Sequence, residues 1–492
     1  MKKLLIANRG EIARRIIRTA KKMGINTVAV FSEADRSSLF VQEADEAICI
    51  GPASSSESYL NIKKIVQAAK LTNANAIHPG YGFLSERAAF SKAVTEAGFI
   101  FIGPSHKSIE MMGDKLEAKK CANEMKVPIL SGSGDAMSDI PSCKAFATKI
   151  GYPVLIKATA GGGGKGMRVV HEESNLVEQL ELASSEAMSS FGNGSVFIEK
   201  YLIAPKHIEV QIIADQLGNC CYLFERECSI QRRHQKIIEE APSPSISEEV
   251  RKEMGEAAVR MAKSCNYSNA GTVEFLFEDG KFYFMEMNTR LQVEHPVTEG
   301  ITGLDLVELQ IEIARGHMLP FQQSELKIAG HSIEVRINAE DPYVDFTPST
   351  GYLNTYRIPK GDGIRVDDAY AEKQEIPIHY DSMIAKLIVH ASTRELAIQK
   401  MKQALSEYVI EGIQTIIPYA TFILNHKKFQ DATMDTTFVR TTFDEFLQTG
   451  EDNPDLKAAA MIAIHAYLEK FNKVRVPDNS NVSWLHLRNE KR

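Results

Sequence analysis

Long apolar runs are missing from this sequence of 492 residues, and their absence excludes a membrane-spanning helix. No segment approaches the roughly 18 consecutive apolar residues that such a helix needs. The first residues, MKKLLIANRGEIARR, begin with basic side chains, but the apolar run LLIA is shorter than a secretory signal requires. We therefore expect a cytoplasmic protein that does not bind a membrane.

Positive charge is also in short supply. The chain has 57 Lys and Arg residues against 64 Asp and Glu residues, which gives a formal net charge of −7. This balance argues against nonspecific binding of nucleic acid, so an anionic substrate would need a local basic site. The length allows about three domains.

Cysteine pairs with redox or metal spacing are missing as well. The seven cysteines are an odd number, and no C-x-x-C motif occurs. This favours reduced thiols in the cytoplasm over disulfides. Cys220, Cys221 and Cys228 are close in sequence, but they lack the spacing of a tetrahedral metal site, so buried or edge-strand thiols are the favoured interpretation.

A dinucleotide-binding motif is absent from the N-terminal segment, although the surrounding pattern would suit one. Residues 3–31 predict a strand, a helix that ends at Gly24, and a second strand, which Asp35 follows. The first turn reads NRGE, with only Gly10, in place of G-x-G-x-x-G, and this argues against dinucleotide binding. Further alternation of strands and helices predicts an open parallel sheet up to about residue 113.

Four consecutive glycines occur in the stretch KATAGGGGKGMRVV. Gly161 and Gly166 have the spacing of a P-loop, but Met167 stands where that motif needs Lys followed by Ser or Thr, so a P-loop is excluded. The flanking segments YPVLIKA and MRVV are strand-like and predict a hairpin. A glycine-rich hairpin loop can cover phosphates with backbone N–H groups, and Lys157 and Lys165 add positive charge. A surface hairpin without a ligand stays open as the alternative.

An acidic hairpin is predicted by GTVEFLF and KFYFMEMN around an EDG turn. Glu286 and Asn288 are two residues apart and share one face of their strand, while Glu274 lies on the partner strand. These are hard oxygen ligands, which suit Mg²⁺ carrying nucleotide phosphates. The apolar residues that alternate on this face, and that are expected to bury it, are Leu276, Phe282 and Phe284.

The register of this hairpin decides whether a metal can be shared. A two-residue loop at Asp279–Gly280 with regular pairing would place position 274 opposite Met285, so that Glu274 and Glu286 would face opposite sides. We therefore predict an odd-numbered loop or a β-bulge that pairs Glu274 with Glu286.

Arg290, Gln292 and Glu294 are expected to continue the same alternation beyond the hairpin. A row of charged and amide side chains is unfavourable to bury without a ligand. It offers metal ligands at one end, a fixed cation in the middle and a general base at the other end. The basic run RRHQK at 232–236 can bring positive charge to an anionic substrate, although a solvated charged segment is the simpler interpretation of those residues alone.

The sequence resembles the biotin carboxylase family, the ATP-grasp component of biotin-dependent carboxylases. The resemblance rests on KLLIANRGEIA, HPGYGFLSE, MGDK, GGGGKGM, FIEKYL, HIEVQI, ERECSIQRRHQKIIEEAP, EMNTRLQVEHPVTE, EVRINAEDP and YDSMIAKLI. These segments follow one another over roughly residues 3–440, which leaves the C-terminal tail outside the pattern.

The resemblance implies an α/β and α+β architecture. The implied parts are a Rossmann-like, pre-ATP-grasp domain with an open parallel sheet at 1–113, an ATP-grasp domain at 114–330 with a mobile lid at about 131–204, a C-terminal biotin-carboxylase-type domain at 331–446, and a helical tail extension at 447–492. In the tail, Asn453 can cap a helix whose first position would be Pro454.

The resemblance also implies a role for individual residues. The implied ATP-binding residues are Lys115, Lys157, Gly161, Gly162, Gly163, Gly164, Lys165, Gly166, Glu199, Lys200, Tyr201, Leu202, His207, Gln231 and His234. The implied metal ligands are Glu274, Glu286 and Asn288, and the implied bicarbonate-binding residues are Lys236, Arg290, Gln292 and Val293. The implied catalytic residues are Lys236, Arg290, Arg336 and Glu294, with Glu294 as general base and Arg336 as the residue that binds biotin.

Biotin itself is expected to arrive on a separate carrier protein. A biotin-accepting lysine lies between two methionines at a hairpin tip in the carrier family, and Met401-Lys402 is the nearest match here. Ile398, Met401 and Leu405 recur at helical spacing, so Lys402 is predicted to lie on an amphipathic helix. The implied cofactors and partners are ATP, Mg²⁺ or Mn²⁺, bicarbonate, a biotin carboxyl carrier protein, carboxyltransferase subunits and a second copy of this chain.

The implied reaction is ATP-dependent carboxylation of biotin, with bicarbonate activated as carboxyphosphate. The alternative is another ATP-grasp ligase, which would join a carboxylate to an amine through an acylphosphate and would not need Arg336. An inactive nucleotide-binding module would be expected to lack a metal ligand or the base, and none is missing. The acyl acceptor of the complete carboxylase stays open among acetyl-CoA, propionyl-CoA, another acyl-CoA and pyruvate.

Overall fold

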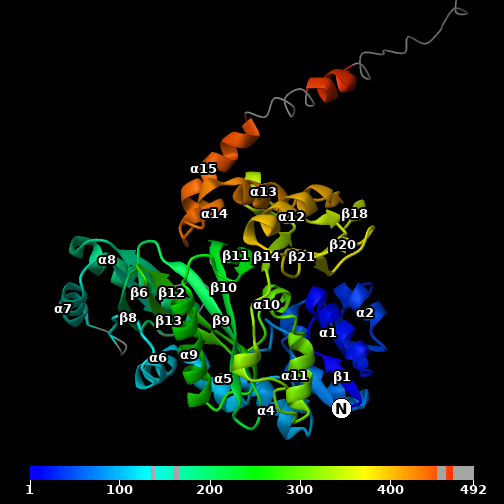
Figure 1. Cartoon of the computed structure of the whole chain (residues 1–492), viewed down its shortest axis with the longest axis horizontal. Helices are drawn as coiled ribbons and strands as arrows, with labels where there is room; N and C mark the ends of the chain where they lie inside the picture. Colours follow the sequence, from blue (N-terminus) through cyan, green and yellow to red (C-terminus); the bar gives the residue numbers. More distant parts are fainter. Residues whose placement is uncertain (134–136, 138, 159–165, 234, 452–460, 469–492) are drawn as a thin grey trace, which may run out of the picture. The chain divides into compact units, whose positions relative to one another are not determined.

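The computed structural model describes residues 1–133, 137, 139–158, 166–233, 235–451 and 461–468. The chain forms two compact units, Met1–Thr441 and Thr442–Arg492. The first unit contains an open parallel sheet and a large antiparallel sheet (Figure 1). Among the helices of the described part of the chain, none is long and apolar enough to cross a membrane.

The N-terminal sheet has the order β3-β2-β1-β4-β5, and its strands pair in parallel, as predicted. Its strands are β1 (Lys3–Ile6), β2 (Asn26–Ser32), β3 (Glu46–Gly51), β4 (Ala76–His78) and β5 (Ile100–Phe101), and its helices are α1 (Gly10–Lys22), α2 (Leu39–Glu43), α3 (Ile62–Leu71), α4 (Ala88–Glu96) and α5 (His106–Gly113). Helix α1 buries Ile12, Ile16 and Ala20 in the core beside β1. Gly24 follows the helix with a φ of +71°, which glycine tolerates best.

Asp35, which follows the second strand where a dinucleotide site would have its acidic residue, is paired with Arg9. Arg9 donates to both carboxylate oxygens of Asp35, at 2.8 and 2.7 Å, and Tyr59 donates to the same carboxylate at 2.6 Å. Asp35 is buried, so its carboxylate is committed to protein donors. This arrangement agrees with the argument from the NRGE turn against dinucleotide binding.

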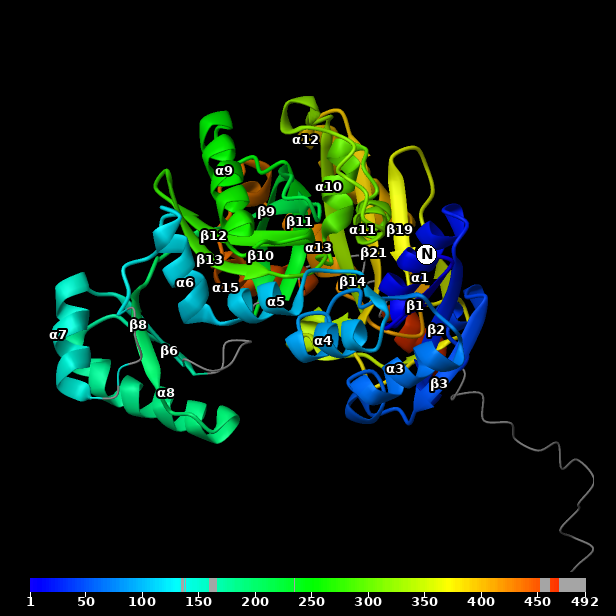
Figure 2. The ribbon, with the colours of Figure 1, turned by 90° about the horizontal axis from the view of Figure 1, so that it is seen from below.

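A smaller sheet of three strands, in the order β7-β6-β8, is flanked by helices (Figure 2). The elements are α6 (Lys115–Glu124), α7 (Ile140–Ile150), β6 (Val154–Ala158), β7 (Met167–Val170), α8 (Leu176–Phe191) and β8 (Val196–Lys200). Strands β6 and β7 pair antiparallel with Lys157 opposite Met167, which confirms that the glycine-rich segment connects two strands. Gly161, Gly162, Gly163, Gly164 and Lys165 lie outside the described residues.

The large sheet has eight strands in the order β13-β12-β9-β10-β11-β14-β21-β19. Its elements and adjoining helices are β9 (Lys206–Ala214), β10 (Cys220–Arg232), β11 (Gln235–Ala241), α9 (Glu248–Ser264), β12 (Asn269–Glu278), β13 (Lys281–Asn288), α10 (His295–Thr302), α11 (Leu306–Ala314), β14 (His331–Asn338), β19 (Ile364–Asp368) and β21 (Met383–Ala391). Strands β11 and β14 pair directly, so the sheet continues across the boundary predicted at residue 331. The domain boundaries themselves stay predictions.

The remaining C-terminal elements are short strands and helices. They are β15 (Glu340–Asp341), β16 (Thr347–Pro348), β17 (Gly351–Tyr352), β18 (Thr355–Arg357), β20 (Glu375–Ile376), α12 (Arg394–Glu407), β22 (Val409–Glu411), α13 (Ile417–Asn425), α14 (Lys427–Gln430) and α15 (Phe438–Glu451). Lys402 lies within α12, whose Ile398, Met401 and Leu405 are buried, as predicted. In the second unit, residues 461–468 are helical, whereas Asn453 and Pro454 lie outside the described residues.

Candidate active site

One face of the large sheet carries a buried layer of polar side chains. On β9, His207, Glu209 and Gln211 alternate with apolar residues, and all three are buried. Glu209 lies opposite Glu274 of β12, and Gln211 lies opposite Thr272. The other face of the sheet packs apolar side chains against α9. The polar layer is therefore internal, and such a layer needs mutual pairing or a ligand.

A β-bulge at Met285 sets the register of the acidic hairpin. The turn is a two-residue loop at Asp279–Gly280, with φ values of +50° and +76°. The pairing shifts next to Glu274, so that Glu274 lies opposite Glu286 and Met285 has no direct partner. The predicted bulge is confirmed, and the two carboxylates share one face of the sheet.

The same bulge corrects the expectation for the neighbouring aromatic residues. Phe284 lies opposite Phe275, which points away from the face of Glu274. Phe282 and Phe284 therefore pack in the core on the far side and do not bury the acidic pair. The expectation that they share the face of Glu286 is wrong, because counting in twos fails across a bulge.

The pKa values of the two hairpin carboxylates, Glu274 and Glu286, are shifted in opposite directions. Glu274 accepts hydrogen bonds from Asn288 at 2.8 Å and Gln292 at 3.2 Å, and its other oxygen lies 3.0 Å from His207 Nε2. Burial alone would raise the pKa of Glu274, but Lys236 and His207 lower it well below its ordinary value. Burial and the charge of Glu274 raise the pKa of Glu286.

This donor set fits a divalent cation. Glu274 and Glu286 are adjacent carboxylates whose mutual repulsion a cation would relieve, and Asn288 adds an amide oxygen. Such hard oxygen ligands are those that Mg²⁺ prefers.

A cluster of lysines lies where α6 meets the small sheet. Lys157 Nζ lies 2.7 Å from Glu199 of β8, and Lys119 of α6 pairs with the same carboxylate. Burial and Lys115 lower the pKa of Lys157 to about 8, and burial with Lys157 and Lys115 lowers the pKa of Lys119 to about 7. Crowded cations of this kind suit an anionic ligand such as a phosphate chain.

The other residues expected to bind ATP are placed in different ways. Gln231 Nε2 and His207 Nδ1 are 3.5 Å apart. Lys200 donates to the main-chain oxygens of Gly151 and Tyr152, both at 3.0 Å, and so fixes the end of β8. Further placements are as follows: Tyr201 and Leu202 are half-buried just after β8, Gly166 has a φ of +71°, and His234 lies outside the described residues.

Glu294 lies between two cations. Lys236 Nζ is 2.5 Å from one carboxylate oxygen, and a terminal nitrogen of Arg336 is 3.0 Å from the other. Burial opposes ionisation, but Lys236 and Arg336 outweigh it and hold the pKa of Glu294 well below its ordinary value. Glu294 is therefore a carboxylate at neutral pH and can accept a proton.

Three residues that the sequence did not single out support this arrangement. Glu209 accepts from Lys236 at 2.6 Å and from Arg226 at 2.5 Å, and Glu239 pairs with Arg336 at 2.6 Å. Cations and anions thus alternate from Arg226 to Glu239. A signal for Glu209 was present in HIEVQI, where it lies two residues after His207 in a strand pattern.

Arg290 and Gln292 reach the same site without extending the strand. Strand β13 ends at Asn288, and Glu294 immediately precedes α10, so the expected continuation of the alternation is wrong. Pro296 suits the first turn of a helix and cannot donate in a sheet. Arg290 donates to Gln292 at 2.7 Å and lies 3.3 Å from Asn288 Oδ1.

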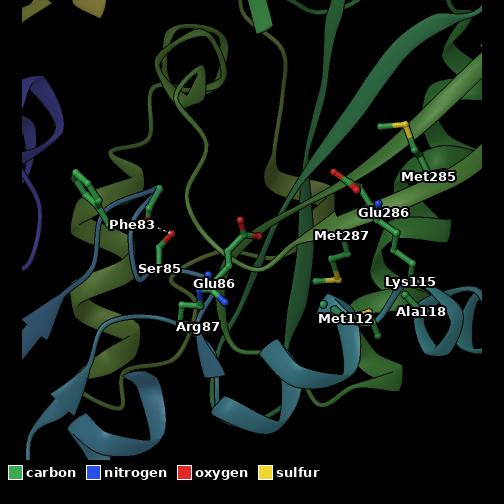
Figure 3. A pocket seen from close by; sticks show the side chains of 12 residues that line it. Phe83, Ser85, Glu86, Arg87, Met112, Lys115, Ala118, Met285, Glu286 and Met287 are labelled. Atoms are coloured by element: carbon green, nitrogen blue, oxygen red, sulfur yellow. Dashed lines mark hydrogen bonds between the residues drawn. The ribbon is translucent and has the colours of Figure 1, made fainter. Parts of the chain in front are cut away.

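A pocket of about 510 Å³ opens beside the acidic hairpin (Figure 3). Lys115, Glu286 and Glu86 line it, and Glu86 accepts from Arg290 Nε at 2.8 Å. The segment HPGYGFLSE, which contains Glu86, thereby reaches the site. The sequence did not single out Glu86 or Lys119, although Lys119 is four residues after Lys115 and shares its helix face.

The fold and this site define an ATP-grasp protein, and comparisons with known proteins agree. Residues 1–109 match the model of the biotin carboxylase N-terminal domain, residues 114–322 match that of the carbamoyl-phosphate synthase L chain ATP-binding domain, and residues 334–441 match that of the biotin carboxylase C-terminal domain.

Individual relatives are similar over most of their length. Biotin carboxylase 1 of Bacillus subtilis is 51% identical over 443 residues, which is 90% of this chain and 98% of the relative. Biotin carboxylase of Haemophilus influenzae is 53% identical over 431 residues, which is 87% of this chain and 96% of the relative. The chain therefore belongs to the biotin carboxylase family.

Solved structures show the same similarity. Biotin carboxylase from Campylobacter jejuni, in a β-γ-ATP complex, has a TM-score of 0.87 and 46% identity, over 89% of this chain and 98% of that one. The biotin carboxylase domain dimer of Hydrogenobacter thermophilus 2-oxoglutarate carboxylase has a TM-score of 0.86 and 47% identity, over 90% and 98% of the two chains. That structure is a complex with MgADP, ADP and bicarbonate.

Proposed function

We propose that this chain carboxylates biotin on a separate carrier protein, using ATP and bicarbonate, as the first half-reaction of a multi-subunit carboxylase. The observation that carries the proposal is the ionised Glu294 between Lys236 and Arg336. A buried base between two cations suits a small anion that must lose a proton. The R-x-Q-x-E row and Arg336 distinguish this reaction from that of a carboxylate–amine ligase.

The first step activates bicarbonate. Lys236, Arg290, Gln292 and the main chain at Val293 orient the anion, and Glu294 takes its proton. The resulting oxyanion attacks the γ-phosphorus of ATP and releases ADP, and the product is carboxyphosphate. Mg²⁺ held by Glu274, Glu286 and Asn288 would supply neutralisation of phosphate charge.

Three lysine residues bind the phosphate chain of ATP for this step. Lys115, Lys119 and Lys157 form a cationic cluster that suits the phosphate chain, since burial and neighbouring lysines already lower the pKa of Lys119 and that of Lys157. Water must be excluded from the loaded site, since it would otherwise hydrolyse carboxyphosphate.

The second step transfers the carboxyl group. Carboxyphosphate splits into CO₂ and phosphate, and the phosphate removes the proton from the ureido nitrogen of biotin. Arg336 stabilises the enolate, which then attacks CO₂. The proposal includes a carrier protein, carboxyltransferase subunits, a homodimer and a cytoplasmic location.

The experiment is to measure ADP release with bicarbonate and free biotin varied separately. Biotin carboxylation requires ATP cleavage that depends on bicarbonate and rises with free biotin. ATP cleavage that depends instead on an amine substrate would support the ligase alternative, and the absence of any cleavage would support an inactive module.

A further inference from the structure

Lys386 is a fully buried cation behind the catalytic turn. It lies on β21, and its side chain is 0% exposed. Its ammonium donates to the main-chain oxygen of Val293 at 2.7 Å and lies 3.5 Å from Glu11 Oε2. Strand β21 and helix α1 thus meet the turn between β13 and α10 through one side chain.

The bond to Val293 acts on the base through the backbone. The carbonyl of Val293 belongs to the peptide group that leads into Glu294, and Glu294 is the residue at the start of α10. This turn lies outside any strand ladder, so the orientation of its peptide groups depends on individual hydrogen bonds. A fixed Val293–Glu294 peptide directs the Glu294 side chain toward Lys236.

We propose that Lys386 is a positioning residue that holds the Val293–Glu294 peptide in the orientation needed for bicarbonate activation, with Glu11 as its counter-ion. The inference rests on the proposed function. It also assigns a role to one residue in each of two segments: Glu11 in KLLIANRGEIA and Lys386 in YDSMIAKLI.

Glu11 contributes compensation for Lys386, because a buried ammonium group is unfavourable alone, and Asp367 of β19, opposite Lys386, is a second nearby acid. The Glu11 side chain is 3% exposed, and it comes from the first turn of α1. Glu11 makes its contact with Lys386, at 3.5 Å, whereas Lys386 contacts the catalytic turn directly through Val293. The two residues should differ when they are substituted separately.

Three variants test this division of roles in the full chain: Lys386→Met, Glu11→Gln and the double variant. The single Lys386→Met change leaves Glu11 buried without a partner, so the double variant removes both charges and preserves folding better. Lys400→Met is the matched control, because Lys400 also donates to main-chain oxygens, those of His390 at 2.8 Å and Asp362 at 2.9 Å.

The readout is the KM for bicarbonate and the KM for ATP in bicarbonate-dependent ATP cleavage, with the melting temperature as a measure of folding. Misplacing a catalytic group should raise the KM for bicarbonate, or lower kcat/KM for it, between about 10- and 100-fold in Lys386→Met and in the double variant. The KM for ATP should stay unchanged. Glu11→Gln should lower the melting temperature but keep the wild-type KM for bicarbonate, as should Lys400→Met.

An unchanged bicarbonate dependence in the folded double variant would overturn the inference, as would an equal rise in the KM for ATP. Failure of the proposed function gives a different result, because the wild-type protein would then show no bicarbonate-dependent cleavage at all.

Discussion

Lys236 Nζ and Glu294 Oε1 lie 2.5 Å apart in a buried ion pair. The pair keeps Glu294 ionised, and it places the base beside a cation that can hold bicarbonate. Bicarbonate must displace part of this contact when it binds, since the ammonium then serves the substrate anion. The site is therefore preorganised for an anion that delivers a proton to Glu294.

Glu294→Gln should abolish bicarbonate-dependent ATP cleavage, because glutamine cannot accept the proton before carboxyphosphate forms. The expected loss is about 100-fold or more, as for removal of a general base. Steady-state ADP release measures it. The matched control is Glu308→Gln on α11, which changes a half-exposed acid outside the site. Wild-type cleavage in Glu294→Gln would remove the residue from its proposed role.

Arg336→Ala should separate the two half-steps. Arg336 is proposed to stabilise the biotin enolate, so its loss should reduce carboxylation of free biotin far more than bicarbonate-dependent ATP cleavage. Both rates are measured on the same sample, with fixation of labelled bicarbonate for the first and ADP release for the second. Arg336 also contacts Glu294, at 3.0 Å, so a modest fall in cleavage is expected. An equal loss of both rates would contradict the assignment.

ATP binding should take up protons near pH 7 to 8. In the free protein, burial and neighbouring lysines lower the pKa of Lys119 to about 7 and that of Lys157 to about 8. Bound phosphates favour the charged form and raise both pKa values, so protons enter on binding. The uptake should fade toward pH 6, where both lysines are already charged in the free protein. Calorimetry in two buffers of different ionisation enthalpy measures it.

Lys119→Met should remove part of this proton uptake. Lys120→Met is the matched control, because Lys120 lies next to it on α6 but its side chain is 55% exposed and near Glu117. Proton release on binding, or uptake unaffected by Lys119→Met, would show that the lysine cluster is not where the phosphates bind.

The purified chain should carry no covalent biotin. Lys402, the nearest match to a biotinylation motif, is on α12 and not at a hairpin tip. Intact mass measurement of protein from cells with an active biotin ligase tests this, with a carrier protein expressed in the same cells as the positive control. A stoichiometric biotin adduct on this chain would contradict delivery of biotin by a separate carrier.

Local pattern predicted much of the fold and part of the site. The parity argument for Glu274 and Glu286 required a bulge, and the bulge is present at Met285. The same pattern failed for Phe282 and Phe284, because a bulge reverses the face of every residue beyond it. It failed again after Asn288, where the chain enters a turn and then α10.

Long-range contacts account for the residues that were missed. Lys386 and Val293 are 93 residues apart, and Arg336 and Glu239 are 97 residues apart. No local period connects such pairs: Arg336 and Glu239 lie on the paired strands β14 and β11, and Lys386 contacts the turn that follows β13. Lys119 could have been predicted from the sequence, because its spacing of four residues from Lys115 places both on one face of α6.

The central claim is that an oxygen of bicarbonate attacks the γ-phosphorus of ATP. The most direct measurement is mass analysis of the phosphate released when the protein turns over in ¹⁸O-labelled bicarbonate, free biotin and unlabelled water. Carboxyphosphate retains the attacking oxygen on phosphorus when it splits, so each phosphate should contain one ¹⁸O atom. Released phosphate without the label would mean that water or another nucleophile attacks ATP, and it would contradict the account.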